Sequence, residues 1–144
     1  MVQVTKTTKP VSDKEIKREW KIIDLKKQIL GRAVNSIAVF LQGKHKTNYV
    51  NYLDMGDNVV VINAKEVVVT GRKADTKTYS FYSGYPSGMR EVPFKTLLEK
   101  DPEKIVRHAV SGMLPKNKLR DQRLARLFVF PGNEHTYGSK FTAK

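Results

Sequence analysis

Basic side chains crowd the segment Gly112–Arg126, in which five residues are Lys or Arg and only Asp121 is an acid. Gly112 can take the left-handed conformation that ends a helix, and Pro115 cannot continue one. The cations that follow are therefore expected at a defined corner of the fold. A fixed corner of positive charge suits a partner with fixed, repeated negative charge, and nucleic-acid backbone is the commonest such partner.

Lys116, Arg120 and Arg123 lie at spacings of four and three, which places them on one face of a helix. The alternative is a solvated face that binds nothing, but Asp121 is the only acid close to them in sequence. Leu119 and Leu127 fall near the same face, so the helical wheel does not decide which side packs inward. Phosphate binding is the favoured interpretation, and its candidates in this segment are Lys116, Lys118, Arg120, Arg123 and Arg126.

A second basic motif, Gly43-Lys44-His45-Lys46, follows a predicted helix end and precedes Tyr49 and Tyr52. Cations beside aromatic rings suit RNA, because unpaired bases stack on the rings while phosphates are neutralised. The alternative is an exposed loop whose tyrosines pack on the domain. Lys44, His45 and Lys46 are taken as candidate RNA-binding residues.

Arg32 stands at the start of a predicted helix, where its charge opposes the positive end of the helix dipole. An anion held by Arg32 and the helix N-terminus would remove that cost, and so would an ion pair with Asp24. Arg72 and Lys73 form a basic turn that either contacts phosphate or faces water. Arg90, after the Gly/Pro-rich loop 83–90, completes the candidate RNA-binding residues.

Motifs for catalysis or cofactor binding are missing from the sequence. It contains no P-loop, no dinucleotide fingerprint and no nucleophile elbow, and its three histidines lack ligand spacing. Asp54 and Asp57 are close together, but beside a glycine they favour a turn role over acid/base chemistry. We predict a protein that is not an enzyme and has no cofactor, metal or small-molecule substrate; an RNA-processing enzyme is a less favoured alternative.

Composition limits the class of protein further. A chain of 144 residues with 40% hydrophobic residues is expected to form one domain with a modest core. Its net charge of +13 destabilises the compact state by self-repulsion, which a polyanionic partner relieves. There is no cysteine, no apolar run of the roughly 20 residues that span a membrane, and no apolar core in Met1–Lys9. A cytoplasmic protein without a membrane partner is predicted.

The elements that must position these cations alternate between apolar strands and amphipathic helices. Strands are predicted over 20–25, 58–62, 67–69, 78–82 and 127–130, and helices over 30–42, 93–100, 102–113 and from about 119. This order indicates a single α/β domain with a mainly parallel sheet of about four strands. Residues 1–18 are predicted to be an N-terminal extension, 19–132 the RNA-binding domain and 133–144 a C-terminal tail.

Several pieces of the chain match a known family in the family's order. They are Leu30-Gly31-Arg32, Gly43–Lys46, Asp57–Ala64, Thr70-Gly71, Ser83–Pro86, Gly112–Asn117 and Glu134-His135. The chain resembles bacterial ribosomal protein thirteen of the large subunit, the universal L-thirteen family. The resemblance runs from about Trp20 to His135, and the combination of Gly43–Lys46 with Gly112–Asn117 is its most specific part.

The resemblance implies a three-layer α/β/α domain, binding to large-subunit ribosomal RNA, a role in subunit assembly and contacts with neighbouring large-subunit ribosomal proteins. It implies no enzymatic activity. The family's RNA-facing basic motifs fall here on Lys44, His45, Lys46, Lys73 and Lys116. The alternative function is a regulator that binds messenger RNA outside the ribosome.

Three features depart from the family's pattern. Arg120 stands where many members have glycine, and Tyr82 replaces a frequent histidine. After His135 the chain reads Thr-Tyr-Gly-Ser-Lys, where the family has a tail rich in Pro, His and Ala. Contacts of the tail are therefore not carried over from the family.

Overall fold

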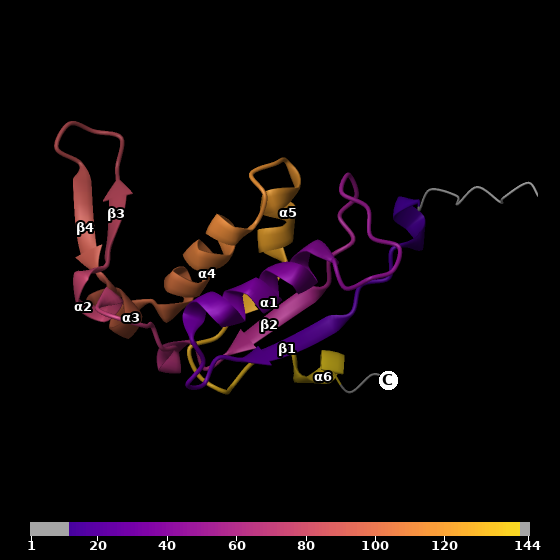
Figure 1. Cartoon of the computed structure of the whole chain (residues 1–144), viewed down its shortest axis with the longest axis horizontal. Coiled ribbons are helices and arrows are strands. Elements are labelled where there is room, and N and C mark those ends of the chain that lie inside the picture. The colour runs from indigo at the N-terminus through magenta and orange to yellow at the C-terminus, as the bar shows by residue number, and fades with distance from the viewer. Residues whose placement is uncertain (1–11, 142–144) are drawn as a thin grey trace, which may run out of the picture.

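A parallel sheet of three strands forms the centre of the computed structural model, which describes residues 12–141 (Figure 1). Its order is β1 (Trp20–Asp24), β2 (Asn58–Ile62) and β5 (Leu127–Val129), with Trp20 opposite Asn58 and Val60 opposite Phe128. The valines of β2 are fully buried, as expected of a central strand in a parallel sheet. The α/β class with a mainly parallel sheet is confirmed.

The sheet has fewer strands than the expected four or so. Residues 67–69, predicted as a strand, contribute only an isolated bridge between Val68 and Ile29. Residues 78–82 do form a strand, β3 (Thr78–Tyr82), but it pairs in antiparallel fashion with β4 (Met89–Pro93) in a separate hairpin. The predicted loop 83–90 is therefore shorter than expected, because its last two residues belong to β4.

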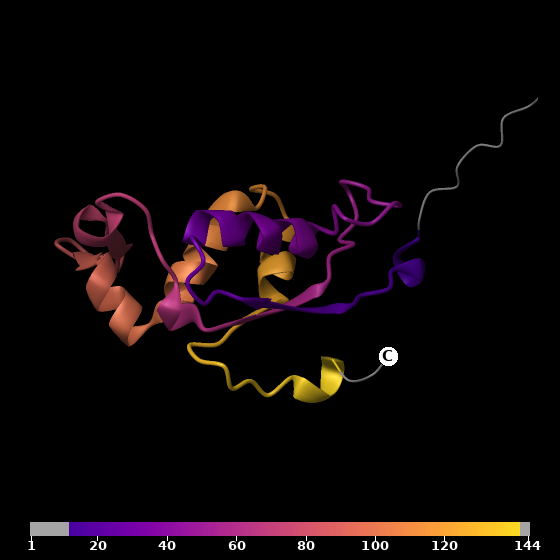
Figure 2. The ribbon, with the colours of Figure 1, turned by 60° about the horizontal axis from the view of Figure 1, so that its bottom comes forward.

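Helices cover one face of the parallel sheet (Figure 2). They are α1 (Leu30–Gln42), α4 (Pro102–Met113) and α5 (Leu119–Ala125), and α1 packs along α4. Their apolar stripes meet the sheet in a single core that includes Ile37, Leu41, Ile105 and Val110. The helical spacing of these residues in the sequence therefore gave the correct buried face.

The opposite face of the sheet is covered by the C-terminal segment, which contains the short α6 (Gly138–Phe141) (Figure 2). The ring of Trp20 stacks on Tyr137 with centroids 5.1 Å apart and on Phe128 at 5.6 Å. Phe141 meets the same indole edge-on at 6.3 Å. The third layer thus consists of aromatic side chains and one helical turn, without the long helices of a symmetrical α/β/α sandwich.

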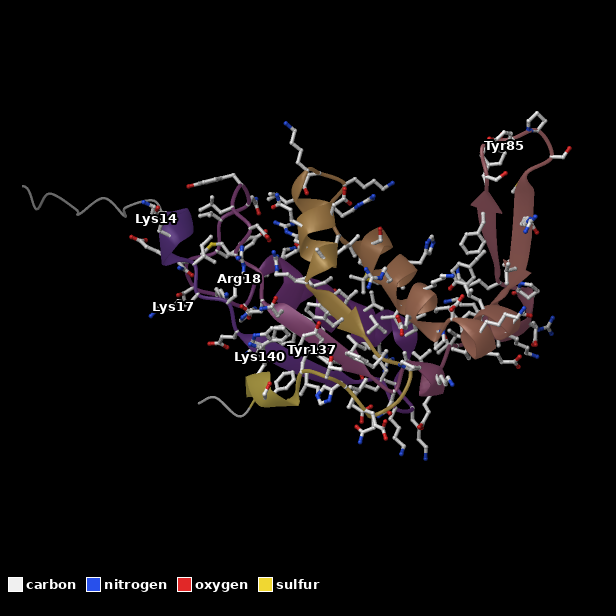
Figure 3. The ribbon with its side chains drawn as sticks, turned by 180° about the vertical axis from the view of Figure 1, so that it is seen from behind. Lys14, Lys17, Arg18, Tyr85, Tyr137 and Lys140 are labelled. Carbon is white, nitrogen blue, oxygen red and sulfur yellow. The ribbon has the colours of Figure 1, made fainter. Side chains whose placement is uncertain are left out.

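The β3–β4 hairpin projects from the body as an arm, with α2 (Lys73–Thr76) and α3 (Phe94–Lys100) at its base (Figure 1). Tyr85 lies in the loop at its tip, far from Lys14 and Lys17 at the other end of the molecule (Figure 3). Large side chains of the arm are exposed, Tyr82 and Tyr85 among them. The arm therefore offers apolar surface that residues 12–141 leave uncovered.

The residues that start or end α1 and α4 agree with the sequence signals in one case and differ from them in two. Gly43 ends α1 with a φ of 78°, in the left-handed region that favours glycine. Gly112 does not end α4, which continues to Met113; the extended Leu114 and then Pro115 stop it instead. Asp101 precedes Pro102, an arrangement typical of a capped helix start, but its side chain does not cap the helix; its carboxylate accepts a hydrogen bond from Lys104 Nζ at 2.8 Å.

Within residues 12–141 no helix combines the length and the apolar character needed to cross a membrane. Of the predicted extension and tail, residues 1–11 and 142–144 lie outside the described residues.

Candidate nucleic-acid interface

The carboxylate of Asp54 gathers three arginines from two distant parts of the sequence. The guanidinium of Arg126 donates from both terminal nitrogens to the two carboxylate oxygens. Arg123 Nε lies 3.5 Å from Oδ1, and Arg18 Nη2 lies 3.8 Å from Oδ2 and donates to the Asp54 carbonyl at 3.3 Å. One acid from the loop before β2 thus holds α5 and the N-terminal segment against the end of α1.

This cluster corrects the expectation that the cations of Lys116–Arg126 lack an acid partner. Arg123 is only 1% exposed, so its guanidinium has no surface to offer a phosphate. Arg126 is largely buried against Asp54 as well. The expected shared face is also absent, because α5 begins at Leu119 and Lys116 precedes it. Lys116 and Lys118 are exposed, and Arg120 is partly exposed beside Asp121.

Asp57 is a second internal anchor, with its side chain fully buried. Its carboxylate lies 2.9 Å from His45 Nε2 and 2.5 Å from Lys46 Nζ, and it accepts the backbone N–H of Glu19 at 3.1 Å. Lys46 Nζ also donates to the carbonyls of Lys17 and Met55, at 2.7 and 2.9 Å. Of the three candidates in this motif, His45 and Lys46 therefore point to the interior acid, although His45 keeps some exposed surface, and Lys44 is exposed and forms no ion pair within residues 12–141.

Close backbone packing fixes the loop that carries both acids. A Cβ on Gly56 would lie 1.8 Å from the carbonyl oxygen of Leu41, so only glycine fits there. The next residue, Asp57, donates its N–H to the carbonyl of Phe40 at 3.1 Å. Asp54 and Asp57 are thus structural residues: buried ion pairs and a backbone hydrogen bond fix their loop, in place of the turn role that the sequence favoured.

The remaining candidates lie near the arm and are all exposed: Arg32, Arg72, Lys73 and Arg90. None of the four forms an ion pair with any residue between 12 and 141. The proposed pairing of Arg32 with Asp24 does not occur, because Asp24 instead accepts hydrogen bonds from Asn63 Nδ2 at 2.7 Å and from the Lys26 N–H at 2.9 Å. These two bonds, Asn63 first, lower the pKa of the Asp24 carboxyl from its ordinary value.

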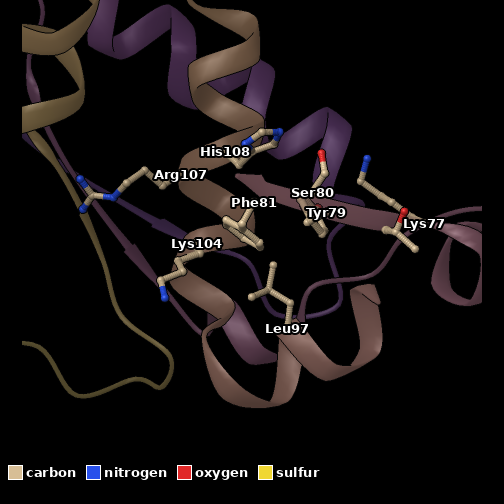
Figure 4. Close-up of a pocket in the computed structure, with 9 residues that line it drawn as sticks. Lys77, Tyr79, Ser80, Phe81, Leu97, Lys104, Arg107 and His108 are labelled. Atoms are coloured by element: carbon tan, nitrogen blue, oxygen red, sulfur yellow. The ribbon is translucent and has the colours of Figure 1, made fainter. Parts of the chain in front are cut away.

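Sequence reasoning missed a hollow where the arm meets the body (Figure 4). Tyr79 of β3 forms its wall, edge-on to the ring of His108 from α4 with centroids 5.4 Å apart. Burial raises the pKa of the Tyr79 hydroxyl. Lys77 Nζ sits 5.0 Å from the centroid of the Tyr79 ring. No local sequence signal connects β3 with α4, so only the folded chain brings these residues together.

The described residues contain no group of three or more His, Asp or Glu side chains placed to hold a metal ion. Residues 18–136 match the family described as Ribosomal protein L13. The chain belongs to this family.

Curated relatives of the L13 family cover most of the chain. The large ribosomal subunit protein uL13 of Clostridioides difficile (strain 630) is 44% identical over 126 residues, 88% of each chain. That of Thermoanaerobacter sp. (strain X514) is 46% identical over 123 residues, 85% of this chain and 86% of the relative. That of Dictyoglomus thermophilum is 49% identical over 123 residues, 85% and 87% respectively. Membership of the L13 family confirms the resemblance and identifies a structural protein without enzymatic activity.

Proposed function

We propose that this L13-family protein is a structural constituent of the cytoplasmic large ribosomal subunit, binds large-subunit ribosomal RNA and supports assembly of that subunit. The observation that carries the proposal is the group of exposed cations that form no ion pair with an acid among residues 12–141, on a chain of net charge +13. The names of the relatives, which are large ribosomal subunit proteins, support the location. Phosphate groups would supply the missing negative charge.

The candidate RNA-binding residues divide into two kinds of contributor. We assign direct phosphate contact to the exposed cations Arg32, Lys44, Arg72, Lys73, Arg90, Lys116 and Lys118, and to the partly exposed Arg120. His45, Lys46, Arg123 and Arg126 act indirectly, since their bonds to Asp57 and Asp54 hold the loops that present the exposed set. Such rigid presentation lowers the ordering cost of binding.

Contacts with neighbouring large-subunit ribosomal proteins belong to the same proposal. The exposed apolar side chains of the arm are the surface that we assign to them: Phe81, Tyr82, Tyr85 and Met89. Exposed aromatic residues and methionine are enriched at protein interfaces, which supports this assignment.

Sucrose-gradient fractionation of a lysate at moderate and high salt tests the location. We expect the protein to migrate with the large subunit at moderate salt. A main pool at the top of the gradient would contradict the proposal and favour the messenger-RNA regulator. Binding to purified large-subunit RNA should weaken with salt, with a log–log slope of roughly −0.7 to −0.9 per phosphate neutralised.

A further inference from the structure

Two adjoining cavities of about 340 Å³ each lie at the junction of the arm and the body. They share Lys77, Tyr79 and His108, so the Tyr79–His108 contact separates them. The first cavity is bounded by β3, α3 and α4 (Figure 4). The second, here called the α1–α4 cavity, opens between the start of α1, residues 69–73 and the end of α4. Among the described residues that line them, neither cavity has a carboxylate.

The α1–α4 cavity carries more uncompensated positive charge than its neighbour. In the first cavity Lys104 is bound to Asp101 at 2.8 Å, and Arg107 donates to the carbonyl of Leu127 at 3.4 Å. In the α1–α4 cavity, Arg32 and Lys73 have no ion pair within residues 12–141. Among residues 12–141, the ammonium group of Lys77, which lies between the two, has only the face of the Tyr79 ring as its partner. An anion entering the α1–α4 cavity therefore displaces no existing ion pair.

Apart from Thr70, Tyr79 and His108, the rest of the α1–α4 cavity is apolar. Its lining includes the buried Leu30 and Val34, the partly buried Val69 and Ala109, and Met113, which is 47% exposed at its rim. A ligand that matches both parts has an anionic group joined to a flat group that can leave water. A nucleotide has this combination, with its phosphate as the anion and its base as the flat group.

We propose that the α1–α4 cavity binds one unpaired nucleotide of the RNA. Its base lies against the apolar lining beside Met113, and its phosphate is held by Arg32, Lys73 and Lys77. The volume of the cavity is near the lower end of the usual range for small ligands, so one nucleotide fits and a base-paired duplex does not enter. This inference rests on the proposed function, which it makes more specific. The protein would recognise one unpaired nucleotide of the RNA in addition to the charge of the RNA backbone.

Substitution at Met113 separates the cavity from the general basic surface. Met113→Glu places a carboxylate at the rim of a cavity that lacks one, while Met113→Gln changes the side chain with almost the same shape and no charge. The side chain is half exposed, so both variants should fold, and thermal unfolding checks this. The probes are a short fluorescein-labelled oligouridine, a blunt RNA duplex of equal charge, and free uridine monophosphate.

Relative to Met113→Gln, Met113→Glu should weaken oligouridine binding about tenfold by repulsion of the phosphate, while duplex affinity changes by less than about twofold. Arg32→Gln and Lys73→Gln should each weaken oligouridine binding about tenfold, the effect of losing one charge-assisted hydrogen bond. Lys65→Gln, an exposed lysine outside both cavities, serves as the control and should have a smaller effect.

Three results would overturn the inference. Equal binding of oligouridine by the two Met113 variants would show that the cavity is empty in the complex. An equal loss for oligouridine and duplex would show a general electrostatic effect. Binding of free uridine monophosphate as tight as that of oligouridine would assign the cavity to a free nucleotide. Gradient migration of the wild type with the large subunit would leave the proposed function standing in each of these cases, so the two failures are distinguishable.

Discussion

The two ends of the molecule use basic side chains in opposite ways. At the anchored end, formed by Asp54, Asp57 and their basic partners, the cations are bound to internal acids and hold loops in place. At the open end, formed by the α1–α4 cavity and the arm, Arg32, Arg72, Lys73 and Arg90 form no ion pair within residues 12–141, and the described lining of the cavity contains no carboxylate. A count of Lys and Arg along the chain cannot distinguish them. What decides the role of each cation is whether a distant acid reaches it in the folded chain.

Removing the acid of the anchored end should have the largest effect. Asp54→Ala leaves the buried Arg123 and Arg126 without their counter-charge, and we expect a loss of about 3–5 kcal/mol in the free energy of unfolding. Urea denaturation measures it. The control is Asp75→Ala, which breaks an ion pair with Lys95 on the exposed surface and should lower the free energy of unfolding far less. Similar losses in the two variants would contradict the anchored role.

Matched substitutions of one arginine at each end sharpen the contrast. Arg32→Gln should change the free energy of unfolding by less than about 0.5 kcal/mol but lower the salt slope of RNA binding by about one. Arg123→Gln should cost about 2–4 kcal/mol in stability, because it disturbs a buried ion pair, and leave the salt slope unchanged. If the salt slope fell for Arg123→Gln and not for Arg32→Gln, the division between the two ends would be reversed.

Alkaline pH should weaken the open end before the anchored end. Burial raises the pKa of Tyr79, so the folded protein holds the phenolic proton more tightly than the unfolded chain does. The contribution of this proton to the free energy of unfolding is fully present below about pH 10, the ordinary pKa of tyrosine. It is lost as the pH rises through the higher pKa of Tyr79 in the folded protein. Urea denaturation across this range should show the loss in the wild type. If Tyr79→Phe lost the same free energy of unfolding at alkaline pH as the wild type, Tyr79 would be excluded as the source of that loss.

The smallest expected effect concerns Asp24, a carboxylate that belongs to neither end. Asn63→Gly removes the amide that bonds to Asp24 but keeps the left-handed backbone of that position, with its φ of 57°. We expect a loss of less than about 1 kcal/mol at neutral pH. Because the pKa of Asp24 is lowered on folding, its contribution exists above the ordinary value of 3.8 and disappears as pH falls through the folded value. The variant and the wild type should therefore converge in acid; a constant difference would contradict this cause.

Local sequence patterns predicted most helices and strands correctly, but they did not predict which strands pair or which distant side chains form ion pairs. The Val-rich run Asn58–Ile62 is β2, and Gly43 ends α1 as expected, because both depend on neighbours within a few residues. The bond between Asp54 and Arg126 joins positions 72 residues apart, and β3 pairs with β4 outside the main sheet. Neither the ion pair nor the strand pairing can be recognised from the hydrophobic periodicity or the charge spacing of the sequence. The exposed cations were found from composition, whereas the cavity that some of them line depends on how the arm meets the body.

Trp20, the only tryptophan of the chain, lies in the first strand to be synthesised, while Tyr137 and Phe141, which cover it, are added more than a hundred residues later. During translation the indole of a nascent chain therefore stays in contact with water long after its own strand has been made. The aromatic side chains that cover this face of the sheet are therefore added late in synthesis, and the fluorescence of Trp20 reports when they cover it.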